Sequence, residues 1–314
     1  MKKSARLLLF LSSVALAFLG SKVQAQSMED LPYPLDTRKI TLPSGVEIAY
    51  VDRGEGPFTL ILLHGLGTYL KAWLHNTDGL AMRNRCIALD LPGYGKSSKG
   101  DYPFSMHFFA EQVALFCAEL GLSKVVLVGH SMGGQIAITL ALQRPDLVER
   151  LVLLAPAGIE TFNEAEANWL KAIYTPEVLK NSTTEQIRKN FLANFYEWPT
   201  TAEILYNDRL ALRQTVEYDA WCRMIPQCVR AMLDEPVFSR LGEIKAPTLI
   251  LFGEQDALIP NRILHPTQNT LQIAQRAQAS IPGSQLRLIP KAGHMLQWEQ
   301  PAAVNDAIKA FLEE

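Results

Sequence analysis

The amino-acid sequence predicts an α/β protein with a mostly parallel central sheet, helices covering both faces, and an inserted helical cap. Short, unbroken apolar runs recur along the chain and alternate with amphipathic stretches, as in sheets whose strands are buried on both faces. One of these runs ends at a serine between two glycines, in residues 129–133. From residue 157 to residue 243 the strand pattern gives way to helix-like stretches rich in aromatic side chains, which indicates the inserted cap.

The order of the elements follows from these runs. The first two strands are separated by Pro43-Ser44-Gly45 and predict an antiparallel hairpin. Reactive groups are expected at the carboxyl ends of the later, parallel strands. The predicted strands are residues 37–41, 46–52, 58–63, 85–90, 125–128, 151–154, 247–252 and 285–289, and the predicted helices include 105–120, 135–144 and 302–314.

The N-terminus has the pattern of a secretory signal peptide. Basic residues precede the apolar run Leu7 to Gly20, and small residues stand before a cleavage point after Ala25. The run is shorter than the roughly 20 residues that cross a bilayer, so no stable membrane anchor is expected after cleavage. We therefore expect an exported protein, periplasmic or secreted, with residues 1–25 as signal peptide, 26–156 and 244–314 as core, and 157–243 as cap.

Charge and composition narrow the classes of partner. Without the four basic residues of the signal peptide, the chain has 26 basic and 32 acidic residues, which argues against nucleic acid as a partner. No spacing of His, Cys and carboxylate residues indicates a metal site, and no glycine pattern indicates a nucleotide cofactor. We expect neither metal nor cofactor.

The four cysteines are too few for a disulfide framework in a chain of this length. Cys86 and Cys117 stand in apolar patterns and are expected to be buried thiols. Cys222 and Cys228 flank Pro226, which leaves two alternatives: a bridge, if the proline bends the chain, or two free thiols.

The chemistry is predicted to centre on Ser131 in the sequence G-x-S-x-G. The flanking glycines allow a sharp turn from strand to helix that exposes the serine hydroxyl. A serine nucleophile needs a base and an orienting acid. His294, in the loop after the last strand, is the expected base, and Asp256, on the loop after the preceding strand, is the expected acid. Glu254 lies on the same loop and stays open as an alternative acid.

From Thr37 to Glu314 the chain resembles α/β-hydrolase fold proteins with a cap, because five motifs occur in that family's order. They are His64-Gly65, Asp90 to Ser97, Gly129 to Gly134, Gly253 to Asp256, and Ala292 to His294. The serine turn followed by Ala155-Pro156-Ala157-Gly158 is also similar to monoacylglycerol lipase-like members. The resemblance implies a serine hydrolase of the esterase, lipase and carbon–carbon bond hydrolase branch, with the order Ser131, Asp256, His294.

Further site residues follow from this chemistry. The oxyanion is expected to be bound by the backbone N–H of Met132 and of Leu66. The aromatic cap indicates an apolar substrate pocket. The residues considered for its lining are His64, His130, Trp169, Trp198 and Trp221.

Three functions are compatible with these residues. The first is hydrolysis of small-molecule carboxylic esters with lipophilic, short to medium acyl chains, or of monoglycerides. The second is cleavage of a carbon–carbon bond in a vinylogous keto acid by the same triad, for which a cap arginine such as Arg188, Arg209, Arg213, Arg223 or Arg230 is available as carboxylate anchor. The third, from another class, is a non-catalytic ligand-binding module on the same fold.

Overall fold

The computed structural model describes residues 27–314, so the predicted signal peptide lies outside the described residues. Within this range the strands form an eight-stranded sheet in the order β1-β2-β4-β3-β5-β6-β7-β8. The strands are β1 (Arg38–Thr41), β2 (Glu47–Arg53), β3 (Thr59–Leu63), β4 (Arg85–Leu89), β5 (Val125–His130), β6 (Val148–Leu154), β7 (Thr248–Gly253) and β8 (Gln285–Ile289).

The sheet is parallel except at its N-terminal edge. β1 and β2 pair antiparallel with Arg38 opposite Tyr50, which confirms the expected hairpin, and β2 pairs antiparallel with β4. From β4 through β3, β5, β6, β7 and β8 all pairs are parallel. The predicted mostly parallel sheet is confirmed, and its parallel strands bring their carboxyl ends to one edge.

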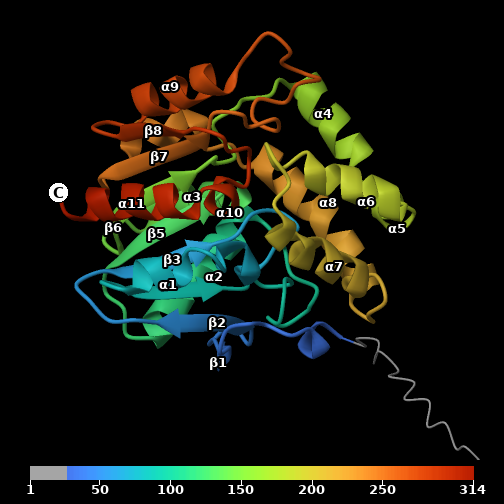
Figure 1. Cartoon of the computed structure of the whole chain (residues 1–314), viewed down its shortest axis with the longest axis horizontal. Helices are drawn as coiled ribbons and strands as arrows, with labels where there is room; N and C mark the ends of the chain where they lie inside the picture. Colours follow the sequence, from blue (N-terminus) through green and yellow to red (C-terminus); the bar gives the residue numbers. More distant parts are fainter. Residues whose placement is uncertain (1–26) are drawn as a thin grey trace, which may run out of the picture.

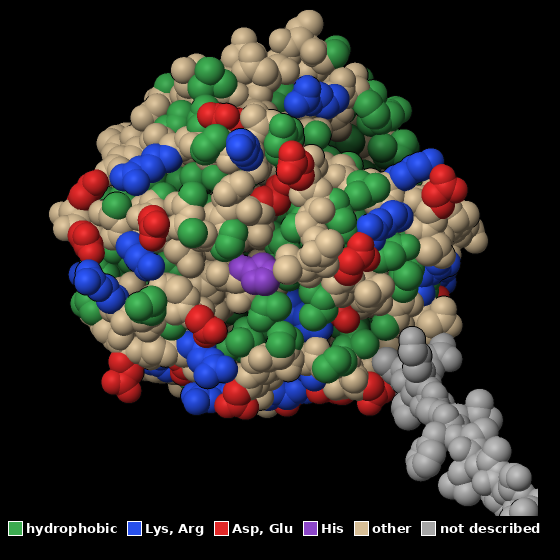
Figure 2. Space-filling view, viewed as in Figure 1, with side chains coloured by type: hydrophobic (Ala, Val, Ile, Leu, Met, Phe, Trp, Pro, Cys, Tyr) green, Lys and Arg blue, Asp and Glu red, His purple; other side chains and the backbone are tan. Residues whose placement is uncertain are grey.

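Helices cover both faces of this sheet (Figure 1). α1 and α11 contact each other on one face, and α2 and α3 contact each other on the other. On the surface shown in Figure 2, basic and acidic side chains are interspersed. The helices of the core are α1 (Thr77–Ala81), α2 (Met106–Glu119), α3 (Met132–Gln143), α9 (Thr270–Ser280), α10 (Leu296–Glu299) and α11 (Pro301–Leu312), with 3₁₀ turns at Met28–Asp30 and Leu70–Trp73.

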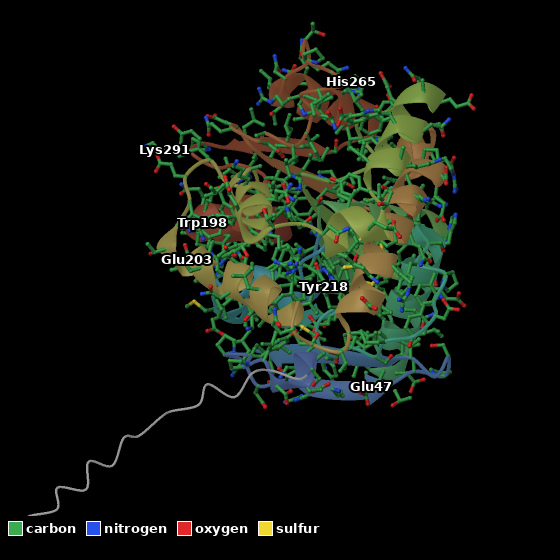
Figure 3. The ribbon with its side chains drawn as sticks, turned by 90° about the vertical axis from the view of Figure 1, so that its right-hand side faces the viewer. Glu47, Trp198, Glu203, Tyr218, His265 and Lys291 are labelled. Carbon is green, nitrogen blue, oxygen red and sulfur yellow. The ribbon has the colours of Figure 1, made fainter. Side chains whose placement is uncertain are left out.

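The chain between β6 and β7 is helical. Its helices gather at one side of the sheet in Figure 1, and Figure 3 looks onto them. They are α4 (Glu164–Ile173), α5 (Pro176–Lys180), α6 (Thr184–Leu192), α7 (Glu203–Leu212) and α8 (Tyr218–Asp234), with 3₁₀ turns at Thr200–Ala202 and Phe238–Glu243. None of the helices in residues 27–314 is long and apolar enough to cross a membrane.

The helix after Ser131 begins earlier than expected, at Met132 instead of residue 135. Its first turn therefore contains Gly133 and Gly134, residues with low helix propensity. The packing explains their place: a Cβ at Gly133 would lie 2.4 Å from the carbonyl oxygen of Leu63, at the end of β3. The glycines let the start of α3 approach β3 closely. Helix propensity describes a helix in isolation, so it does not account for this packing contact.

Helix α9 has no counterpart among the predicted elements. It is rich in Gln and Ala and has a weak apolar pattern, although Ile273, Ala274 and Ala277 are buried. The sequence does contain a signal for the start of this helix, since Asn269 and Gln272 form a reciprocal capping box at its N-terminus.

All four cysteines are buried and free, so the bridge between Cys222 and Cys228 is not present. Both residues lie in α8, and Pro226 is accommodated inside this helix. Six residues of α-helix advance about 9 Å along the axis, which exceeds the spacing of a disulfide.

Candidate active site

Ser131 lies at the junction of β5 and α3 with φ 53° and ψ −118°. A positive φ is strained for a residue with a side chain, and its presence here is typical of a functional turn. The turn depends on its glycines, because a Cβ at Gly129 would lie 2.3 Å from the carbonyl oxygen of Gly133. Close packing of strand and helix thus holds Ser131 at the carboxyl edge of the sheet.

His294 and Asp256 meet at the same edge. The Nδ1 atom of His294 lies 2.9 Å from Oδ2 of Asp256, and both side chains are buried. The other carboxylate oxygen, Oδ1, accepts the backbone N–H of Leu258 at 2.8 Å and of Ile259 at 3.1 Å. With Nδ1–H directed to Asp256, the other ring nitrogen, Nε2, is the one left to act as a base.

The geometry distinguishes the two acids of this loop. Asp256 contacts the imidazole, whereas Glu254 is exposed and its side chain accepts a hydrogen bond from the amide of Gln255. The backbone N–H of Asp256 donates to the carbonyl of Gly253, which turns the loop back toward β7. The loop therefore directs Asp256 toward His294.

His130, the residue before Ser131, connects the serine turn to the His294 loop. Its Nε2 lies 2.9 Å from the carbonyl oxygen of His294. Because a carbonyl only accepts, Nε2 carries the proton and Nδ1 has none. Burial lowers the pKa of His130 well below its usual range, and the nearby His294 lowers it further. The ring is therefore neutral, and it also lines a cavity beside Ser131.

His64 is buried in the structure and does not line either cavity beside Ser131. Its Nδ1 donates to the carbonyl of Gly65 (2.9 Å), and its Nε2 accepts the N–H of Leu91 (3.1 Å). Burial lowers its pKa to about 4, so the ring is neutral at pH 7. His64 thus ties the loop that contains Leu66 to the loop after β4.

Two adjoining lobes of one site open at Ser131, each of about 320 Å³. They share Leu66, Ser131, Tyr174, Leu258 and His294. The first lobe extends toward α6, α7 and α8 and includes Asn190, Phe191, Asn194, Arg209 and Trp221. The second lobe extends toward the loops after β6 and β7 and includes Glu160, Phe162, Val229, Met232, Phe238 and Asn261.

The linings of the two lobes separate the remaining candidate pocket residues into two groups. His130 and Trp221 line the first lobe, whereas Trp169 and Trp198 line neither. Trp169 lies on α4 with 38% of its surface exposed. Trp198 donates from Nε1 to Glu203 at 2.8 Å, and Figure 3 shows the two side by side. Its indole packs against Phe195, so it supports the helical segment from outside the lobes.

Arg209, one of the five arginines from Arg188 to Arg230 that the sequence could not separate, lies in the first lobe. Its guanidinium stacks on Trp221, with 4.1 Å between Cζ and the ring centroid, and donates to the carbonyl of Gly67. No carboxylate of the described residues forms an ion pair with it. Burial lowers its pKa to about 10, so the group is still charged at neutral pH. The lobe therefore contains an unpaired cation.

Glu160 in the second lobe was not expected from the sequence. It follows β6 with no motif around it, and it is brought to the site by the loop after β7. Arg209 is the sole Arg, Lys, Asp or Glu residue in the lining of the first lobe, and Glu160 is the sole one in the lining of the second. The two lobes thus contain opposite charges.

The two expected oxyanion donors, Leu66 and Met132, both belong to segments next to Ser131. Leu66 lines both lobes beside Ser131. Met132 is the first residue of α3, and the first bonds of the helix run from the N–H groups of Gly134 and Gln135 to Ser131 (2.9 and 3.2 Å). The N–H of Met132 thus precedes the helical ladder. Among residues 27–314 no cluster of three or more His, Cys, Asp or Glu residues is arranged to hold a metal ion.

Comparison with known proteins gives a family and two kinds of relative. The family described as alpha/beta hydrolase fold matches residues 59–301. The dihydrolipoyllysine-residue acetyltransferase component of an acetoin cleaving system from Pseudomonas putida is 30% identical over 266 residues, 83% of this chain and 65% of the relative. This chain thus spans slightly less than two thirds of that relative.

A second relative is matched over most of its length. A 2-hydroxy-6-oxononadienedioate/2-hydroxy-6-oxononatrienedioate hydrolase from Klebsiella pneumoniae is 29% identical over 276 residues, which cover 83% of this chain and 89% of the relative. Among solved structures, a thermophilic esterase from Thermogutta terrifontis superimposes with a TM-score of 0.68 at 26% identity, covering 88% of this chain and 98% of the esterase.

Proposed function

The chain belongs to the α/β-hydrolase fold family, and we propose that it is a serine hydrolase that cleaves carboxylic esters of lipophilic, short to medium acyl chains, as an esterase or monoacylglycerol lipase-like enzyme. One observation carries the proposal: the strained Ser131 lies with His294 where the two lobes meet. The Nδ1 atom of this histidine is hydrogen-bonded to Asp256. Most of the lining of the second lobe is apolar, which suits a lipophilic group.

In this proposal the reaction proceeds through an acyl-enzyme. Oγ of Ser131 attacks the acyl carbon while Nε2 of His294 takes its proton, and the oxyanion is bound by the N–H groups of Met132 and Leu66. The C–O bond to the alcohol then breaks, and the alcohol leaves with the proton from His294. Water, deprotonated by His294, attacks the acyl-enzyme and releases the acid and Ser131. Asp256 holds the imidazole and stabilises its charged form.

The test is a series of chromogenic esters of increasing acyl length, assayed with the wild type and the Ser131→Ala variant. We expect hydrolysis by the wild type with an optimum at short to medium chains, and a loss of at least about a thousandfold in kcat for the variant. Equal activity of the two proteins would remove Ser131 from its role. If both were inactive on every ester and yet bound the same ligand, the non-catalytic binding module would be the better description.

A second candidate function is supported by a specific observation, the unpaired Arg209 in the first lobe. A vinylogous keto acid carries a carboxylate, and a buried guanidinium is a suitable partner for it. The Klebsiella relative is named as a hydrolase of such acids. A keto-acid dienol cleaved faster than any ester would favour this function. The Arg209→Gln variant should then lose keto-acid cleavage while it retains hydrolysis of neutral esters.

We also propose that residues 1–25 direct export and are removed, and that residues 157–243 form a cap over the site. The basic and apolar N-terminal pattern supports the first point, and the helices between β6 and β7 that contribute to both lobes support the second. N-terminal sequencing of the protein from the periplasm and the culture medium tests cleavage. A mature chain that begins at Met1 and stays in the cytoplasm would contradict the proposal.

A further inference from the structure

Glu160 is a buried carboxylate at the wall of the second lobe, on the loop after β6. Its Oε1 accepts the backbone N–H of Asn261 at 2.8 Å and lies 2.5 Å from Nδ1 of His265. His265 is fixed in turn: its ring stacks on Phe162, and its Nε2 lies 3.5 Å from Glu166 on α4. Figure 3 labels His265 on the side of the molecule that carries these elements. Glu160 is therefore held rigidly from one side.

The second oxygen of Glu160 is not used by the protein. Oε2 accepts no hydrogen bond from the described residues. It is also not completely enclosed by protein atoms. Since Glu160 is 9% exposed and lines the second lobe, the space open to Oε2 belongs to that lobe. An acceptor oxygen thus faces the cavity that begins at Ser131 and His294.

The surroundings make this acceptor selective. The lobe is otherwise mostly apolar, with Leu170, Val229, Met232 and Phe238 in its wall. A charged acceptor in apolar surroundings is costly to leave without a partner, and a hydrogen bond to it is correspondingly favourable. Burial raises the pKa of Glu160, whereas the bonds from His265 and Asn261 lower it. A substrate carboxylate would need an Arg or Lys side chain as its partner, and the lining of this lobe contains neither.

We propose that Glu160 is a specificity-determining residue: its free oxygen binds a hydroxyl or ammonium group on the part of the substrate that occupies the second lobe. The inference rests on the proposed ester hydrolysis and adds a substrate class to it, esters with a hydrogen-bond donor at some distance from the scissile bond. Arg209, with the opposite charge, lies in the other lobe and gives the site a fixed polarity.

The test uses two series of three esters. In one, the alcohol part ends in a methyl, a hydroxyl or an ammonium group at the same position; in the other, the acyl part does. We expect the wild type to prefer the hydroxyl or ammonium member over the methyl member by about tenfold in kcat/KM in one of the two series. The hydroxyl and ammonium arms show which donor is bound.

Glu160→Gln is the informative variant. Because Oε1 must remain an oxygen to accept the N–H of Asn261, the amide nitrogen replaces Oε2 and presents a donor to the lobe. We expect the preference for the donor-bearing esters to disappear, which is read from the ratio of kcat/KM between the donor-bearing and methyl members in the same protein. Glu166→Gln is the matched control, since Glu166 contacts His265 but does not line the lobe. It should retain the wild-type preference.

Binding to the Ser131→Ala variant separates this inference from the proposed function. Titration of the same esters into Ser131→Ala, and into Ser131→Ala with Glu160→Gln, measures recognition without turnover. Tighter binding of the donor-bearing member to the first protein alone supports the inference even if the wild type hydrolyses none of them. Equal affinities for all members in both series, or a parallel loss for all members on Glu160→Gln, would overturn it and leave Glu160 with a purely structural role.

Discussion

His130 donates a hydrogen bond from Nε2 to the backbone carbonyl of His294, with 2.9 Å between the two atoms. The ring centroids of the two residues lie 4.9 Å apart. The bond joins the end of β5 to the loop after β8, between residues that are 164 positions apart in the chain. The residue before the proposed nucleophile therefore helps to place the loop of the proposed base.

This relationship makes a kinetic prediction. His130→Leu retains bulk but removes the donor, so the His294 loop loses one of its anchors. We expect kcat for ester hydrolysis to fall by about fivefold, since one neutral hydrogen bond stabilises by about 1 kcal/mol. His130→Gln, which can present an N–H at the Nε2 position, should recover part of the loss. Unchanged kcat in the leucine variant would show that the bond does not position the base.

The lowered pKa of His64 leads to a prediction of how the free energy of unfolding depends on pH. Its pKa in the folded protein is about 4, below the ordinary value of 6.5. As pH falls below about 6.5 the unfolded chain gains a proton that the folded chain does not, so the free energy of unfolding decreases until about pH 4. The full effect is about 3 kcal/mol.

Urea unfolding between these pH values measures the effect. In His64→Gln the amide oxygen still accepts the N–H of Leu91, but the titrating group is gone. The difference in unfolding free energy between wild type and variant should therefore shrink as the solution is made more acidic. A difference that is independent of pH over this range would mean that His64 titrates normally in the folded protein.

Gly129 predicts a large effect of adding one methyl group. A Cβ at this position would lie 2.3 Å from the carbonyl oxygen of Gly133, a backbone atom that cannot move without displacing α3. We expect Gly129→Ala to lower the free energy of unfolding by about 2 kcal/mol or more and to abolish activity through the displaced Ser131.

Gly242→Ala is the control for this change. The nearest heavy atom to a Cβ at Gly242 is 4.0 Å away, so we expect a change within about 0.5 kcal/mol. Chemical denaturation of both variants, together with ester assays, makes the comparison. Wild-type stability and activity in Gly129→Ala would show that the serine turn tolerates a looser contact.

Lys71 and Asp208 form a buried ion pair between the core and α7. The Nζ atom lies 2.6 Å from Oδ2, and the lysine side chain is fully buried. Lys71→Met leaves the carboxylate of Asp208 buried without its cation, with the hydroxyl of Tyr69 as its remaining partner. We expect a loss of about 3 kcal/mol in unfolding free energy.

The double variant Lys71→Met with Asp208→Asn should recover part of this loss, because the uncompensated charge is removed as well. Urea unfolding of the two single variants and the double variant gives the coupling energy directly. Strictly additive effects would contradict a direct interaction. Since Asp208 precedes Arg209 in α7, the loosened helix should also weaken any binding of anionic ligands in the first lobe.

The sequence determined the parts of the fold that depend on neighbouring residues. Unbroken apolar runs specified the buried strands, and the glycines around Ser131 specified the sharp turn after β5. Strand order then predicted that loops after β7 and β8 would meet at the serine, and Asp256 and His294 do lie 2.9 Å apart. Local patterns were sufficient there because parallel strands bring their carboxyl ends to one edge.

Tertiary structure alone decided the contacts between residues distant in the chain. Five arginines from Arg188 to Arg230 were equivalent in the sequence, and the packing of α7 placed Arg209 in the first lobe. Trp198 and Trp221 both belong to the helical segment between β6 and β7, yet Trp198 packs outside the lobes and Trp221 lines the site. Glu160 stands in no motif, and its orientation depends on Asn261 and His265, about a hundred residues later. Side-chain environment is a property of packing between elements, which neither periodicity nor motif spacing encodes.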